Sequence, residues 1–131
     1  GECILYCTGK KSSLQEAIAK GDRESNFLQI EDKEYIDLEE PGVLVNHSCN
    51  PNAGIMNNLK LIAIRNISEG EEITYDYSTT LDEEYWTMEC LCSQKDCRKR
   101  VKDFKYLPKE LQEKYLQLGI VQEFISKKYR E

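Results

Sequence analysis

The chain has 131 residues, enough for one domain with a buried core but not for two. Its 18 Lys and Arg against 24 Asp and Glu give a net charge of −6, which argues against a protein that binds nucleic acid directly and suits a basic peptide partner. Hydrophobic residues make up 40% of the chain, as in folded proteins. No apolar run approaches the roughly 18–20 residues of a membrane span, so we expect no membrane contact.

The N-terminal third predicts strands on either side of one helix. Residues 2–8 (ECILYCT) favour a buried strand. A helix is expected to follow, because Ser13 lies three residues before Glu16, the spacing of a capping box, and Gly21 can end it. Two short apolar segments around the turn sequence Glu-Asp-Lys then predict a hairpin, over residues 26–30 and 34–38.

The middle of the chain has the strongest strand patterns. Residues 59–67 and 71–77 are rich in β-branched and aromatic residues and are joined by a turn around Gly70. The segment before them, residues 46–54, is rich in Asn, Pro and Gly and predicts irregular backbone.

The C-terminal part predicts two helices. Pro108 suits the first turn of a helix that reaches Leu118 and ends at Gly119. The second helix carries one apolar stripe, formed by Val121, Phe124, Ile125 and Tyr129. The whole pattern predicts a mostly β domain of short strands with a helical C-terminal tail.

Six cysteines point to metal chemistry in a reducing compartment rather than to disulfides. Three of them lie within eight residues, too close for easy mutual bridging, whereas a secreted disulfide scaffold is usually shorter and richer in cysteine. A structural zinc ion takes four thiolate or imidazole ligands, so Cys90, Cys92 and Cys97 leave one ligand to find. Spacing alone does not choose among the candidates, which are Cys3, Cys7, His47 and Cys49.

Three motifs in chain order make the sequence similar to a known family. They are NHSCNPN at residues 46–52, GEEITYDY at 70–77 and CLCSQKDCR at 90–98. Together they resemble the SET-domain protein-lysine methyltransferases that carry a post-SET zinc loop. GECILYCTG and FLQIEDKEYID also resemble strands of that family, so the likeness covers about residues 1–101. The tail from Phe104 resembles only small bacterial members.

The resemblance implies a SET-type fold of several short β-sheets with a knot-like threaded segment. It implies a SET domain over residues 1–88, a post-SET zinc loop over 89–103 and a helical C-terminal extension over 104–131. Cys49 becomes the fourth ligand of one Zn²⁺ with Cys90, Cys92 and Cys97, and the neighbouring Lys95, Arg98 and Lys99 are expected to offset the charge of the four thiolates.

The same resemblance assigns roles around a cofactor pocket. Asn46 and His47 match residues that hold S-adenosylmethionine, with His47 as a hydrogen-bonding contact and not a general base. Tyr77 matches the catalytic tyrosine, and Tyr75 matches the position that tunes how many methyl groups are added. Asn52 is expected to be a turn former. By itself, GEEITYDY would indicate only a turn, two solvated glutamates and an aromatic strand.

The chain departs from the family pattern at four places. It contains no Gly-x-Gly, the usual cofactor loop near the start of the family, and it begins without methionine, so we expect further sequence upstream. Val43 stands where the family commonly has arginine, Cys7 where many members have a tyrosine, and Lys99 where glycine is common.

The sequence is compatible with three functions. The leading one is S-adenosylmethionine-dependent methylation of a lysine in a protein, with a basic, histone-like tail as the expected substrate. The alternatives are a non-catalytic SET-like module that binds a protein partner, and a zinc-stabilised interaction domain without cofactor. We expect an intracellular, reducing compartment: the cytoplasm of a bacterium, or the nucleus if the protein is eukaryotic or a secreted effector.

Overall fold

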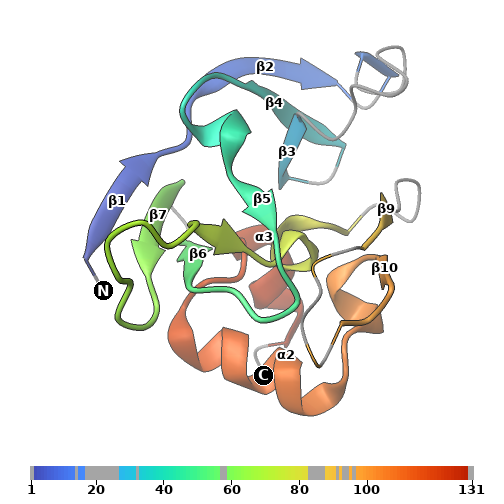
Figure 1. The fold of residues 1–131 in the computed structure, drawn as a ribbon. Coiled ribbons are helices and arrows are strands. Elements are labelled where there is room, and N and C mark those ends of the chain that lie inside the picture. Colours follow the sequence, from blue (N-terminus) through green and yellow to red (C-terminus); the bar gives the residue numbers. More distant parts are fainter. Residues whose placement is uncertain are drawn as a thin grey trace.

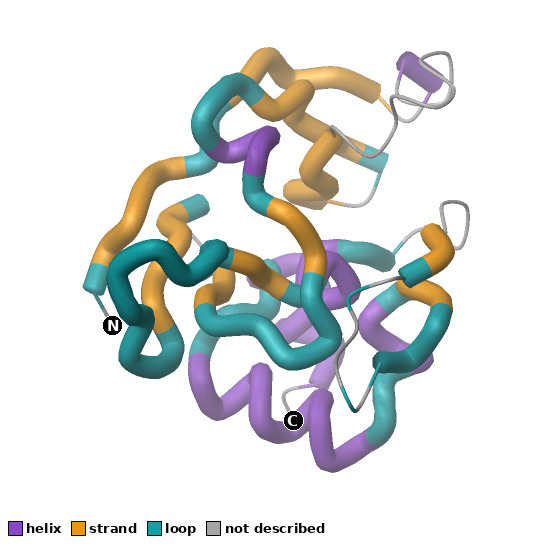
Figure 2. The backbone as a smooth tube through the Cα atoms, viewed as in Figure 1, coloured by secondary structure: helices purple, strands orange, loops and turns teal. Residues whose placement is uncertain are grey.

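Several small β-sheets and short helices make up the computed structural model (Figures 1 and 2). The structure describes residues 2–13, 15–16, 27–31, 33–56, 59–82, 88–90, 92, 95 and 97–129. Strands lie in the upper and middle parts of the view, and the C-terminal helices lie together in the lower part. The predicted mostly β architecture with a few short helices is confirmed.

Two three-stranded antiparallel sheets come from the first half of the chain. One has the order β2 (Gly9–Ser13), β4 (Glu34–Leu38) and β3 (Phe27–Glu31), which confirms the predicted hairpin. The other has the order β1 (Cys3–Tyr6), β7 (Lys60–Ala63) and β6 (Ala53–Ile55). In the second sheet β1 is an edge strand.

The edge position of β1 corrects one expectation. Residues 2–8 were predicted to be a buried strand, but Cys3 and Tyr6 at the two ends of β1 are exposed. An edge strand pairs with a neighbour on one side only, so its other side stays open to solvent. In β1 the two central residues are half-buried and the two end residues are exposed. The thiol of Cys7, just after the strand, is buried.

The expected capping box is present at the start of the predicted helix. The Ser13 N–H donates to Glu16 Oε1 at 3.1 Å, and the Glu16 N–H donates to Ser13 Oγ at 3.2 Å. The remainder of that predicted helix lies outside the described residues.

Two further pairs of strands hold the motif segments. The parallel pair is β5 (Asn46–His47) with β8 (Thr74–Tyr75), and the antiparallel pair is β9 (Met88–Glu89) with β10 (Arg100–Val101). The strands predicted over 59–67 and 71–77 are therefore shorter than expected and do not pair with each other. The segment 46–54 was predicted to be irregular. Its first two residues form β5 and its last two belong to β6, and the five residues between them are irregular.

The second of those strands ends early because a side chain caps a turn. A 3-10 helix, η3 (Tyr77–Thr80), starts directly after β8. Asp76 accepts a hydrogen bond from the Ser78 N–H at 3.0 Å, which stabilises the first turn of that helix in place of further strand pairing. Tyr77 is thus the first residue of a helix and not the end of a strand.

The C-terminal helices confirm the prediction for that part of the chain. After η4 (Phe104–Tyr106) comes α2 (Lys109–Leu118), which ends at Gly119 with φ of 72°. The second helix, α3 (Glu123–Ser126), is shorter than its apolar stripe implied and continues as η5 (Lys127–Tyr129). A 3-10 turn, η2 (Gly42–Leu44), precedes β5. No helix in the described residues is long and apolar enough to cross a membrane.

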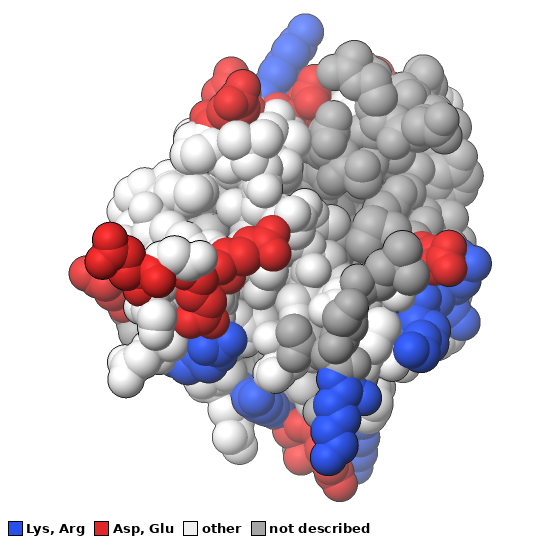
Figure 3. Space-filling view, viewed as in Figure 1, with Lys and Arg blue, Asp and Glu red and all other residues white. Residues whose placement is uncertain are grey.

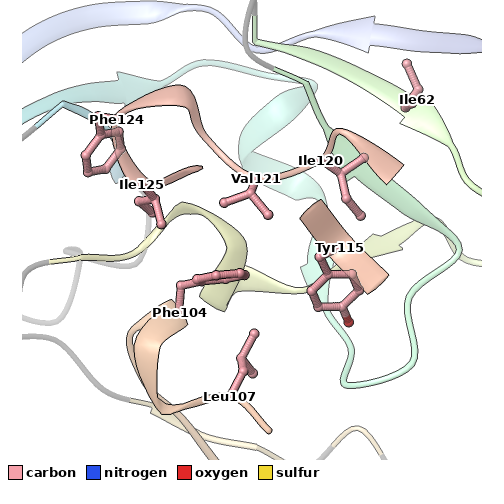
Figure 4. Packing of buried hydrophobic residues seen from close by; sticks show 8 residues of the cluster. All are labelled: Ile62, Phe104, Leu107, Tyr115, Ile120, Val121, Phe124 and Ile125. Atoms are coloured by element: carbon pink, nitrogen blue, oxygen red, sulfur yellow. The ribbon is translucent and has the colours of Figure 1, made fainter. Parts of the chain in front are cut away.

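These helices are part of the core rather than a loose tail. Figure 4 shows the cluster in which they pack, and Ile62 of β7 is one of its members. A Cβ on Gly54 would lie 2.6 Å from Ile120, so only glycine lets β6 approach the segment after α2 this closely. A second cluster lies between the sheets and contains Cys7, Leu28, Ile36, Ala53, Ile55, Leu61 and Tyr75.

Candidate functional site

Pairing between β5 and β8 brings two of the three sequence motifs together. Asn46 lies opposite Thr74 and His47 opposite Tyr75. The Ser48 N–H then donates to the Tyr75 carbonyl at 3.2 Å, which extends the contact by one residue. Residues almost thirty positions apart in the sequence therefore share one small parallel ladder.

Asn52 joins the same two segments through its side chain. It is 1% exposed, and its amide Nδ2 donates to the Glu72 carbonyl at 2.7 Å and to Glu71 Oε2 at 3.2 Å. Its Oδ1 accepts the Thr74 N–H at 2.9 Å. Sequence reasoning treated Asn52 as a turn former, but a buried amide with these partners clamps the loop to β8.

A cavity of about 520 Å³ opens beside this ladder. Its wall includes five residues that the sequence predicted for the catalytic, cofactor and metal sites: Asn46, His47, Tyr77, Cys90 and Cys92. The other three, Tyr75, Cys49 and Cys97, are not on this wall; Tyr75 is 6% exposed and lies in the core cluster beside it. The predicted site residues thus converge, with Tyr75 one layer behind the others.

Two acidic residues, Glu71 and Glu72, which the sequence pattern alone would place in solvent, also line the cavity. The Asn46 side chain donates to Glu72 Oε2 at 2.8 Å, and Arg65 pairs with Glu71 at 3.0 Å. Hydrogen bonds from the Ser68 N–H and Asn52, followed by Arg65, lower the pKa of Glu71. Figure 3 shows acidic side chains gathered over the loop between β7 and β8, so this face of the molecule favours cationic ligands.

His47 is a neutral hydrogen-bonding residue in this arrangement. Its Nδ1 accepts the Tyr77 N–H at 3.0 Å, which places the proton of the neutral ring on Nε2, 3.4 Å from Cys49 Sγ. Burial lowers the pKa of His47 to about 4, against the opposing effect of Asp76. With both ring nitrogens occupied and the ring neutral, His47 is poorly suited to act as a general base.

The two tyrosine rings are in contact at a tilted angle of 39°, and both hydroxyls are protonated. Their ring centroids lie 4.8 Å apart, and the Tyr77 hydroxyl donates to the Val45 carbonyl at 2.7 Å. Burial, with a smaller effect of Glu72, raises the pKa of Tyr77 to about 12. Burial also raises the pKa of Tyr75 well above its ordinary value, with Tyr77 adding to the shift. At neutral pH both are phenols that orient neighbours rather than take protons.

Four cysteines form a cluster that has the composition of a zinc site. The Sγ atoms of Cys49, Cys90, Cys92 and Cys97 all lie within 4.8 Å of one another. Tetrahedral zinc with sulfur ligands requires sulfur separations of about 3.8 Å, and Cys49 and Cys90 are 3.7 Å apart. Among the candidates for the fourth position, the structure brings the Cys49 thiol to the triad, and His47 contacts Cys49 without being one of the four clustered ligands.

Backbone N–H groups also point at these sulfurs. The Arg98 N–H donates to Cys49 Sγ and the Lys99 N–H to Cys97 Sγ, both at 3.4 Å. Such bonds favour the thiolate form that a metal requires, whereas burial without metal raises the pKa of both Cys49 and Cys90. Binding of a metal ion here therefore involves release of thiol protons.

The arginine beside the cluster has another main partner. Arg98 Nη2 lies 2.7 Å from Oδ1 of Asp76, which is 1% exposed. The charge of Arg98 also acts to lower the pKa of Cys49, against the larger effect of burial. Asp76 was missed by sequence reasoning; its position between two aromatic residues of the TYDY motif was the available signal. Lys99 has φ of 69°, a left-handed conformation, which explains why glycine is common there in the family.

Cys3 and Cys7 stay outside the cluster and should differ in reactivity. Cys3 is exposed, whereas burial raises the pKa of Cys7 to about 11 and leaves it 5% exposed. We expect iodoacetamide at pH 8 to modify Cys3 at least about tenfold faster than Cys7 in the folded protein, measured by peptide mass spectrometry. Equal rates are expected in guanidinium; equal rates in the folded protein would contradict this account.

Comparison with known proteins identifies the family. The SET-domain family model matches residues 1–78 of the chain. The chain belongs to the SET-domain family. This SET domain is 36% identical over 85 residues to the H3 lysine-36 specific histone-lysine N-methyltransferase of Candida albicans, covering 56% of the chain and 10% of the relative. It is 30% identical over 96 residues to that of Mycosarcoma maydis, covering 64% and 10%.

Solved structures agree with this assignment of the fold. The SET domain matches the methyltransferase domain of human SETMAR with a TM-score of 0.62 at 20% identity, covering 79% of this chain and 50% of that one. It matches Arabidopsis thaliana SUVH6 in complex with SAM with a TM-score of 0.61 at 22% identity, covering 78% and 28%. The chain spans about a tenth of the length of the two fungal relatives.

Proposed function

We propose that this SET domain is a protein-lysine N-methyltransferase that uses S-adenosylmethionine. The observation that carries the proposal is the convergence of Asn46, His47 and Tyr77 on one cavity that Cys90 and Cys92 of the thiol cluster also line. The names of the fungal relatives and the SAM complex of SUVH6 support it. We further propose the limits 1–88 for the SET domain, 89–103 for the zinc loop and 104–131 for the C-terminal extension.

The residues present fit both implied groups. The cavity offers a side-chain amide, backbone and carboxylate oxygens for a cationic cofactor, and we assign Asn46 and His47 to hold it. We assign Cys49, Cys90, Cys92 and Cys97 to one structural Zn²⁺, because four clustered thiols with N–H donors to the sulfurs match its preferred ligand set. A metal there would fasten the cysteine loop against the wall of the same cavity.

The chemistry requires a neutral amine beside a methyl donor. S-adenosylmethionine supplies, when bound, a methyl group on a positively charged sulfur. Lysine has an ordinary pKa of about 10.4, so the protein must favour its uncharged form. Tyr77 on the cavity wall and Tyr75 packed behind it form an aromatic environment that disfavours an ammonium, and the Tyr77 oxygen, whose proton is donated to Val45, accepts a hydrogen bond from the amine. Positioning and electrostatics then provide most of the rate enhancement.

For the substrate we propose a basic, histone-like tail. The fungal relatives are named for lysine 36 of histone H3, and a net charge of −6 with exposed Glu72 at the cavity suits a cationic peptide. In a eukaryotic cell the site of action would be the nucleus. We propose no direct contact with nucleic acid and none with membrane.

The proposal is tested by binding and by methyl transfer. Calorimetry on the zinc-loaded protein should show saturable S-adenosylmethionine binding, and Asn46→Ala and His47→Ala should each weaken it by about tenfold. Tritiated-methyl transfer to mixed histones and to a host lysate should follow, with this chain and with one extended upstream. Binding without transfer to any protein would favour the alternative of a non-catalytic module.

The degree of methylation should depend on Tyr75. We expect mainly mono- and dimethyl-lysine from the wild type, and a shift toward trimethyl-lysine in Tyr75→Phe, because the lost hydroxyl leaves room for a methylated nitrogen while the ring stays packed. Mass spectrometry with excess cofactor measures the distribution. Tyr6→Phe, at a side chain 56% exposed, is the matched control. An unchanged distribution in Tyr75→Phe would remove this role.

A further inference from the structure

A buried carboxylate lies between the two active-site tyrosines and receives bonds from three segments. Asp76 Oδ1 accepts from Arg98 Nη2 at 2.7 Å and from the Ser78 N–H at 3.0 Å. Its other oxygen, Oδ2, accepts the hydroxyl of Tyr115 at 2.9 Å. Arg98 belongs to the cysteine loop and Tyr115 to α2, so one carboxylate connects β8, the candidate zinc site and the C-terminal helix.

The Tyr115 hydroxyl is not needed for packing. Tyr115 is 1% exposed and lies in an apolar cluster, where Figure 4 shows its hydroxyl oxygen on the side away from Phe124. A phenylalanine would fill the same space. In the described part of the chain, the hydrogen bond given for the Tyr115 hydroxyl is the one to Asp76. Burial, with Asp76 adding to it, raises the pKa of Tyr115, so it remains a hydrogen-bond donor.

Asp76 in turn is coupled to the residues that line the cavity. The next residue, Tyr77, donates its N–H to His47 Nδ1 at 3.0 Å, and Asp76 Oδ1 lies 3.7 Å from the same nitrogen. Arg98, in the cysteine loop, bonds Asp76 through its side chain and also donates its backbone N–H to Cys49 Sγ. Asp76 and the Tyr77 N–H therefore approach the same ring nitrogen, and we expect that loss of a bond to Asp76 loosens the adjoining backbone that orients the Tyr77 ring.

We propose that Tyr115 is a positioning residue for the methyl-transfer site, because its hydroxyl holds Asp76 and thereby the Tyr77 backbone against His47. Helix α2, which lies beyond residues 1–78 matched by the family model, is then a working part of the site. The inference rests on the proposed function for its kinetic consequence only. Its structural consequence, the fixed Tyr77 backbone, is independent of catalysis.

The test compares Tyr115→Phe with Ile125→Val in the zinc-loaded full chain. Both variants alter the same buried cluster, but only the first removes the bond to Asp76. We expect Tyr115→Phe to keep one zinc per chain, to speed amide hydrogen exchange at Tyr77 by about tenfold and to lower kcat by about tenfold. KM for the peptide should stay within about twofold. Ile125→Val should leave Tyr77 exchange and kcat at the wild-type values.

The outcomes separate this inference from the proposed function. Wild-type Tyr77 exchange in Tyr115→Phe, or equal effects in both variants, would overturn the positioning role. If the wild type transfers no methyl group but Tyr77 exchange still rises selectively, the proposed function fails and the link from α2 stands. Should Tyr115→Phe not fold, Arg98→Lys loosens the same carboxylate from the opposite side, and unchanged Tyr77 exchange there overturns the inference.

Discussion

Replacement of Tyr77 by phenylalanine should lower kcat for methyl transfer by about 100-fold or more while the protein stays folded. The ring would keep its contact with Tyr75, so the main loss is the hydroxyl that donates to the Val45 carbonyl, on a residue that lines the proposed cofactor cavity. Loss of one such bond costs about 1 kcal/mol of unfolding free energy, too little to unfold a typical domain. Circular dichroism and single-turnover transfer measure the two effects separately.

The matched control for this experiment is Tyr106→Phe. Tyr106 lies away from the cavity in η4 and is 57% exposed, so removal of its hydroxyl should leave kcat within about twofold of wild type. Cofactor affinity should also be nearly unchanged in Tyr77→Phe, because Asn46 and His47 remain in place. Wild-type turnover in Tyr77→Phe would contradict the catalytic role that we propose.

Loss of one zinc ligand should have the largest effect on stability. We expect wild type to bind one zinc per chain and Cys49→Ser to lose it, with a fall of several kcal/mol in the free energy of unfolding. Cys49 is also a neighbour of His47 and accepts the Arg98 N–H, so cofactor affinity should fall with the metal. Elemental analysis, thermal unfolding and calorimetry measure the three quantities.

Cys3→Ser is the control, since Cys3 is exposed and lies outside the thiol cluster. It should retain zinc, stability and cofactor affinity. Treatment of wild type with a strong chelator should reproduce the Cys49→Ser phenotype, and added zinc should reverse it. Retention of full zinc affinity in Cys49→Ser, or its loss in Cys3→Ser, would show that the ligand set is different.

Local patterns in the sequence were sufficient for much of the fold. The capping box of Ser13 and Glu16, the hairpin of β3 and β4, and the end of α2 at Gly119 all depend on contacts within a few residues, so composition and spacing predict them. The density of Cys90, Cys92 and Cys97 likewise indicated a metal site. The three motifs, taken together, were sufficient for the family, and the match over residues 1–78 confirms it.

The tertiary structure decided what depends on segments far apart in the chain. Spacing left four candidates for the fourth ligand, and only the fold brings Cys49 to the other three thiols. The role of Asn52 as a clamp, the pairing of β5 with β8, and the bonds of Arg98 and Tyr115 to Asp76 all join residues at least 19 positions apart. Hydrophobic periodicity predicts which face of a helix is buried but not against what, so α2 looked like a tail. The place of Tyr115 in one buried cluster with Ile62 of β7, and its hydrogen bond to Asp76, follow from packing that no local pattern encodes.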